Sequence, residues 1–223
     1  MATRFYLTRT LHTTINPGTL GTWGSSVKAI YNMELPNPGA SSFLSSLYTG
    51  YGQGTVLFRQ FISPEMSPGI VFDGTTTYNL VMRHSESSTS ANAFQQWALS
   101  IVDDTGATSY FSALTVKDST EFGTSLAARS NTQTGGITYT TVTGDRLVLE
   151  VGWDQDGSGS YTITNSLGNT STDLSGEGDT GVQNPWFETS NTITFGGGDP
   201  PPPATSEDYE LTAYISGVLD EWV

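Results

Sequence analysis

Apolar and polar residues alternate along most of this chain with the two-residue period of a β-strand. The clearest example is residues 146–153, where every second residue is Leu, Val or Trp. Tyr78, Leu80 and Met82 alternate in the same way, and so do residues 97–101. Such alternation places the apolar side chains on one face of a half-buried strand. The pattern therefore predicts strands in these three segments.

Weaker patterns predict further extended segments. Residues 1–15 place Phe5, Leu7 and Leu11 at alternating positions, whereas residues 16–54 are rich in Pro and Gly and predict loops around a candidate inner strand at 27–33. The remaining expected strands are 55–62, which is apolar enough to be buried on both faces, and 110–116, 137–142, 161–163 and 186–195.

Turn-forming residues separate these segments. Asp73-Gly74 and Asp156-Gly157 suit tight hairpins, because Gly accepts the positive φ that such turns need. Only residues 124–129 have a helix-like pattern, and they are too few for a stable helix. About eight to ten strands without a convincing helix predict an all-β fold. We expect a two-sheet antiparallel sandwich, jelly-roll-like, with extended N-terminal and C-terminal arms.

A composition change near residue 196 marks a domain boundary. Three Gly and four Pro follow one another between Gly196 and Pro203, a combination typical of a spacer. We expect a sandwich domain at 1–196, a linker at 197–206 and an apolar arm at 207–223. The arm carries too much apolar surface for a free disordered tail, so it must bury against its own sandwich or a neighbour. The expected interface residues are Phe5, Tyr6, Tyr209, Leu211, Tyr214, Ile215, Leu219 and Trp222.

Charge excludes several kinds of partner. Twenty-two carboxylates against eight Lys and Arg give a net charge of -14, which repels nucleic acid and anionic membranes alike. The sequence holds no apolar run of about 20 residues that would span a bilayer. It has no Cys, and its first residues lack a signal-peptide pattern. We therefore expect synthesis in a cytoplasm, with no disulfides.

Few residues suggest catalysis or metal binding. His12 and His84 are the only histidines, they are far apart in sequence, and a role for either in catalysis is not favoured. Residues 123–127 approach a serine nucleophile motif but lack the strand-to-helix turn that it requires. Asp154, Asp156 and Ser158 resemble the start of a calcium loop, yet Asn165 stands where such a loop needs Glu. A hairpin turn is the preferred interpretation, ahead of adventitious calcium.

The acidic residues do not select a catalytic pair either. Residues 173–179 form an acidic run of the kind that is usually solvated, and Asp118 and Glu121 have no obvious partner. A glycosidase needs two carboxylates at a set separation, and nothing singles out such a pair. Exposed Trp and Tyr could form a sugar-stacking platform, although most of these rings should lie in the core. We expect no enzyme activity, no cofactor and no metal.

Four segments carry a resemblance to a known family. They are Phe5-Tyr-Leu-Thr8, Thr120-Glu-Phe122-Gly-Thr124, the run from Gly144 to Gly152, and the run from Asn184 to Phe195. In this order they resemble a family of β-sandwich structural proteins carried by tailed bacteriophages and their prophages. The resemblance covers about residues 1–196, and its motifs are strand signatures without catalytic content.

The resemblance implies a virion component. Together with the acidic charge, it leads us to expect a cement or decoration protein on the capsid exterior that bridges neighbouring subunits. The expected partners are the major capsid protein or other virion proteins and further copies of the chain, with a trimer favoured. The first alternative is a tail or fibre receptor-binding module that recognises host glycans. The second is a secreted carbohydrate-binding or glycosidase-like domain.

Overall fold

In a computed structural model, residues 1–19, 21–26, 29–37, 44–106, 114–167 and 172–196 are described. Within these ranges the regular structure is fourteen strands and one three-residue 3-10 helix, η1 (Thr89–Ala91), which confirms the all-β prediction. The strands are β1 (Thr3–Leu11), β2 (Ser25–Ser26), β3 (Ile30–Glu34), β4 (Leu44–Tyr51), β5 (Gly54–Ile62), β6 (Val71–Phe72), β7 (Thr77–Glu86), β8 (Ala93–Val102), β9 (Leu114–Glu121), β10 (Ala127–Thr134), β11 (Tyr139–Thr140), β12 (Arg146–Gln155), β13 (Tyr161–Leu167) and β14 (Trp186–Thr189).

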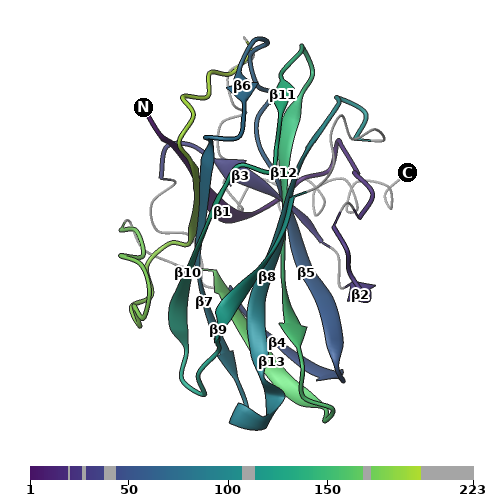
Figure 1. Cartoon of the computed structure of the whole chain (residues 1–223), viewed down its shortest axis with the longest axis vertical. Helices are drawn as coiled ribbons and strands as arrows, with labels where there is room; N and C mark the ends of the chain where they lie inside the picture. The colour runs from purple at the N-terminus through teal and green to yellow at the C-terminus, as the bar shows by residue number, and fades with distance from the viewer. Residues whose placement is uncertain (20, 27–28, 38–43, 107–113, 168–171, 197–223) are drawn as a thin grey trace, which may run out of the picture.

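Twelve of these strands form one continuous sheet that folds over into a sandwich. Its order is β4-β13-β7-β14-β1-β3-β5-β12-β8-β9, with β10 also pairing with β7 and β2 with β5. Figure 1 shows β7 and β10 on one side of the molecule and β5, β8 and β12 on the other. The short strands β6 and β11 form a separate ribbon at one end.

Most neighbouring strands are antiparallel, as predicted, but β2 and β3 run parallel to β5. Residues 35–53 connect β3 to β5, and this connection includes β4. A connection of a dozen or more residues is what parallel neighbours require, so the direction of β3 follows from this long excursion.

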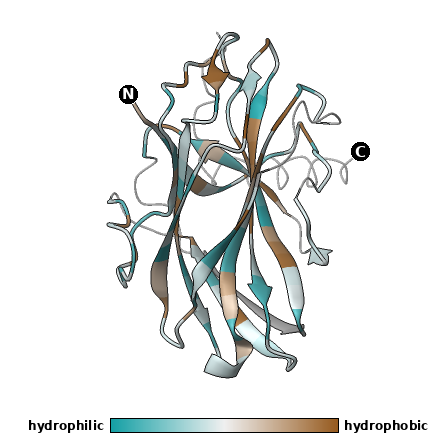
Figure 2. Ribbon diagram, in the orientation of Figure 1, coloured by the Kyte–Doolittle hydropathy of each residue, from teal (hydrophilic) through white to brown (hydrophobic). Residues whose placement is uncertain are grey.

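Aromatic rings fill the space between the layers. The ring centroid of Phe187 on β14 lies 6.5 Å from that of Phe5, 6.4 Å from that of Tyr78 and 6.1 Å from that of Trp97. These four residues come from β14, β1, β7 and β8, and all are fully buried. The strands expected from the clearest alternation, at 78–82, 97–101 and 146–153, are confirmed as parts of β7, β8 and β12, and Figure 2 shows apolar and polar residues alternating along the strands.

Three local predictions need correction. The N-terminal segment is not an arm, because β1 pairs with β14 on one side and β3 on the other. Residues 44–51 lie in the predicted loop region but form β4, which pairs with β13. Residues 127–134 were not expected to be extended but form β10, which pairs with β7 over eight residues, and residues 124–129 form no stable helix, as expected. Neighbouring strands supply the hydrogen bonds here and override the weak local pattern.

The predicted linker and C-terminal arm, residues 197–223, lie outside the described residues. Within the described part, the chain ends beside residues 65–67, where Gly196 N–H donates to the Glu65 carbonyl and Ser67 N–H donates to the Thr194 carbonyl. The described residues include no helix that is long and apolar enough to cross a membrane.

Candidate functional site

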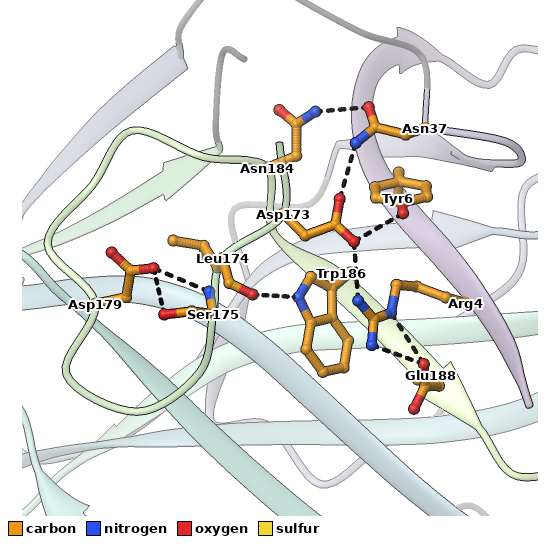
Figure 3. Close-up of polar contacts among 10 residues, drawn as sticks. All are labelled: Arg4, Tyr6, Asn37, Asp173, Leu174, Ser175, Asp179, Asn184, Trp186 and Glu188. Carbon is orange, nitrogen blue, oxygen red and sulfur yellow. Dashed lines mark hydrogen bonds and ion pairs between the residues drawn. The ribbon is translucent and has the colours of Figure 1, made fainter. Parts of the chain in front are cut away.

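Residues 172–184 fold over the sheet face that points away from the main core. Side chains alternate between faces along a strand, so Trp186 points to this outer face while Phe187 points inward. Leu174 packs there with Trp186, Val81 and Ala128 in a second, small apolar cluster. The segment thus forms a partial third layer, and polar contacts surround its apolar centre (Figure 3).

One carboxylate lies at the centre of these contacts. Asp173 Oδ2 accepts from Arg4 Nη1 at 2.8 Å and from the Tyr6 hydroxyl at 3.0 Å, and Oδ1 accepts from Asn37 Nδ2 at 2.9 Å. Asn37 Oδ1 in turn accepts from Asn184 Nδ2 at 2.9 Å. Asp173 therefore joins β1, the segment after β3 and the 172–184 segment. Figure 3 shows these side chains converging on it.

Arg4 contributes the cation of this cluster. Its Nε donates to Glu188 at 2.9 Å, and its guanidinium lies 3.8 Å from the centre of the Trp186 ring. Stacking on an indole and pairing with two carboxylates both favour the charged form. Burial lowers the pKa of Arg4, but the hydrogen bonds to Asp173 and Glu188 raise it by more, so the pKa lies above its ordinary value. Burial and the same carboxylate raise the pKa of Tyr6, which stays neutral.

The tip of the segment is held by a second carboxylate. Asp179 Oδ2 accepts from the Ser175 N–H at 2.9 Å, and Oδ1 accepts from the Gly181 N–H at 2.8 Å. Backbone hydrogen bonds of this kind lower the pKa of Asp179. The Ala128 N–H donates to the Asp179 carbonyl, which ties the tip to β10. The acidic run is therefore an ordered segment, held by its carboxylates, although Glu177 remains exposed.

The segment that resembles a calcium loop connects β12 to β13. The predicted hairpin is wrong here, because β12 pairs with β5 and β8 whereas β13 pairs with β4 and β7. Lys117 Nζ lies 2.7 Å from Asp154 Oδ2 and 3.3 Å from Asp156 Oδ2. The carboxylates therefore have a cation from β9 between them. Among the described residues, no group of three or more His, Asp or Glu is arranged to hold a metal ion.

Both histidines serve structural contacts. His84 is 1% exposed, stacks on Phe122 with ring centroids 4.5 Å apart, and places Nδ1 2.6 Å from Asn165 Oδ1. Its Nε2 lies 2.9 Å from Gln95 Nε2, so the neutral tautomer with the proton on Nδ1 satisfies both contacts. Burial lowers the pKa of His84 to about 3. His12 pairs with Asn32, and burial lowers its pKa too.

The expected interface residues that are described lie within the chain's own structure. Phe5 is fully buried, so its side chain is not exposed to a neighbouring subunit. Tyr6 is half-buried and donates to Asp173. The other six, Tyr209, Leu211, Tyr214, Ile215, Leu219 and Trp222, lie outside the described residues.

The four tryptophans that lie among the described residues do not form the sugar-stacking platform considered above. Trp97, Trp153 and Trp186 are buried, as expected for most rings in a sandwich of this size. Trp23 is half-buried, and its Nε1 donates to Glu150 at 2.7 Å.

Glu150 is a structural residue that sequence reasoning missed. It lies on β12 and is fully buried. Its carboxylate accepts from the Gly21 N–H at 2.6 Å and from Gln60 Nε2 at 2.6 Å, in addition to Trp23. A carboxylate within the otherwise apolar run Leu147–Val151 was the available signal, because a buried charge needs several donors.

No protein-family model matches the sequence, and no curated protein matches it. One solved structure with a detectable similarity is the crystal structure of a CocE/NonD family hydrolase from Staphylococcus aureus. The match has 12% sequence identity and a TM-score of 0.29, and it covers 88% of this chain and 34% of the hydrolase chain. At this level the likeness supports no statement about function.

Proposed function

We propose that this chain is a structural protein of a bacteriophage virion, a cement or decoration protein on the capsid exterior. One observation carries the proposal: the polar clusters around Asp173, His84 and Lys117 are built from partners within the chain itself. Each cluster joins segments that are distant in sequence. A module built in this way offers a rigid surface for assembly rather than converging reactive groups.

Charge supports a position on the outside of the shell. The chain carries a net charge of -14, which disfavours contact with packaged nucleic acid. The family resemblance of residues 1–196 supports the virion role itself. Synthesis in the host cytoplasm followed by incorporation into the particle completes the proposal.

Partners are proposed from the C-terminal sequence. The run from Tyr209 to Trp222 is apolar and follows a Gly- and Pro-rich spacer. We propose that it bridges to the major capsid protein or to a further copy of this chain, with a trimer favoured. Addition of a strand to a neighbour's sheet edge would pair its backbone and cover its apolar side chains.

Copy number in purified particles tests this role directly. Quantitative mass spectrometry of purified virions from a producing culture should find the chain in hundreds of copies per particle. A handful of copies would favour a tail or fibre part instead. Absence from particles, combined with binding on a glycan array, would overturn the virion role and favour a carbohydrate-binding module.

A further inference from the structure

Two carboxyl groups meet where β7, β8 and β9 come together. Glu86 ends β7 and is 2% exposed, and Glu121 ends β9 and is half-buried. The backbone brings the two residues close, because the Glu86 N–H donates to the Gly123 carbonyl and the Phe122 N–H donates to the Ala93 carbonyl. The two carboxyl groups lie within hydrogen-bonding reach of each other.

Each carboxyl group keeps one oxygen without a partner. Glu86 Oε2 accepts from the Ala93 N–H at 3.0 Å, but Glu86 Oε1 is buried without a hydrogen bond. Glu121 Oε1 is also buried without one. An ionised carboxylate only accepts hydrogen bonds, whereas a protonated one donates, so a single proton between the two groups satisfies an oxygen on each. Leaving both ionised would place two like charges together in a poorly hydrated site.

The neighbouring charges do not neutralise this pair. Arg129 on β10 is the nearest cation, but its Nη1 pairs with Glu177 at 2.7 Å and its Nη2 donates to the backbone carbonyl of Glu121. His84, two residues before Glu86 on the same strand, is neutral because burial lowers its pKa. Asp118 on β9 adds a further carboxyl beside Arg129. Among the described residues, β8 and β13 present Ala93 and Ile163 toward Glu86, without charge.

We propose that Glu86 and Glu121 share one proton and thereby make this end of the sandwich a pH-sensitive clamp. With the proton in place, the two carboxyl groups bridge β7 and β9, and Glu86 anchors the start of β8. Loss of the proton leaves two buried negative charges that push these strands apart. The proposal is independent of the virion role.

Titration is consistent with this arrangement. Burial raises the pKa of Glu86 to about 7, against the lowering effect of the Ala93 hydrogen bond, and Glu121 raises it further. A glutamate whose pKa is higher in the folded state than in the unfolded state favours folding at low pH. Its contribution to stability is fully present at a pH below its pKa in the unfolded state. The contribution is lost as the pH rises through its pKa in the folded state. The expected loss therefore lies between about pH 4.5 and about pH 7.

Thermal melting between pH 6 and pH 8.5 tests the clamp. Ordinary carboxylates are already ionised in this range, and both histidines titrate below their usual pKa, so few other groups interfere. We expect the melting temperature of the full chain to fall by a few degrees from pH 6 to just above pH 7 and to level off at higher pH. Glu86→Gln should remove most of the fall, because the buried group no longer titrates, and Glu121→Gln should reduce it, because Gln supplies a permanent donor to Glu86. The matched control Asp104→Asn, at an exposed carboxylate beyond the opposite end of β8, should keep it.

Carbon-13 NMR of the side-chain carboxyls provides a readout that does not depend on either variant folding. One proton should leave the Glu86 and Glu121 pair with a midpoint near pH 7. Titration of both carboxyls below pH 5 would overturn the proposal. So would a melting temperature that is constant from pH 6 to pH 8.5, or one that falls equally in Glu86→Gln and in the unmodified chain.

Discussion

Asp173 joins segments that are up to 169 residues apart in sequence through Arg4, Tyr6 and Asn37. All three donors are at least partly buried, so without Asp173 they would lack an acceptor and water would reach them poorly. Asp173 therefore holds the 172–184 segment and the N-terminal strand in one arrangement.

Replacement of this acceptor should destabilise the fold measurably. Asp173→Ala removes the partner of three donors, and we expect it to lower the free energy of unfolding by about 1–3 kcal/mol. The Asp173 side chain is 29% exposed, so water replaces part of the loss and the lower half of that range is expected. Urea unfolding followed by tryptophan fluorescence measures the change.

Glu177→Gln is the matched control in the same segment. Glu177 pairs with Arg129, but its side chain is 49% exposed, and exposed ion pairs contribute less than about 1 kcal/mol. If Asp173→Ala and Glu177→Gln lower the free energy of unfolding equally, Asp173 contributes no more than an exposed surface charge.

The contacts of Asp173 could not be predicted from the sequence. The acidic run around it was recognised, but its bonding depends on β1 and β14 becoming neighbours in the sheet. By contrast, burial of Leu147, Leu149 and Val151 followed directly from their two-residue spacing. Local periodicity reports which face a side chain occupies, and it carries no information on which distant segment will face it.

At the scale of elements, β12 depends on one glycine. A Cβ at Gly152 would lie 1.9 Å from the Val56 carbonyl oxygen, beside an irregularity in the register between β12 and β5. We expect Gly152→Ala to cost about 1–3 kcal/mol or more, because backbone on the paired strand must move. Thermal or urea unfolding provides the measurement.

Gly74 supplies the comparison for this prediction. No atom lies within 4 Å of a Cβ at Gly74, and its φ is not in the left-handed region. Gly74→Ala should therefore change stability by less than about 0.5 kcal/mol. If Gly152→Ala changes stability as little as Gly74→Ala, β12 does not approach β5 closely enough to exclude a Cβ atom at residue 152.

The connection between β12 and β13 should not require calcium. Lys117 already lies between Asp154 and Asp156, and a divalent cation there would have to displace it. Melting temperatures with EDTA and with millimolar calcium should agree within a few degrees. A large rise with calcium would show binding to the native state and would restore the calcium-loop interpretation.

Strands with strong alternation were predictable and strands without it were not. β7, β8 and β12 match the segments expected from their apolar spacing. β4 and β10 were missed, because the sequences LSSLYTGY and AARSNTQT show little alternation. Each pairs with a better-patterned strand, β4 with β13 and β10 with β7, and this pairing determines its conformation.

At the scale of the whole molecule, we interpret the chain as a sandwich followed by an attachment segment. The sandwich of residues 1–196 contains its own aromatic core, and every strand described belongs to it. Residues 197–223 carry a spacer followed by apolar residues, and four Pro in polyproline geometry span about 12 Å. We therefore expect the C-terminal segment to serve attachment to neighbours rather than folding of the sandwich.

Deletion of residues 199–223 tests this central claim most directly, with sedimentation velocity as the measurement. The full chain should sediment as an oligomer or with its particle. The shortened chain should sediment as a monomer at the rate of a folded sandwich and should no longer join the particle. A shortened chain that is unfolded, or one that assembles as the full chain does, would contradict the claim.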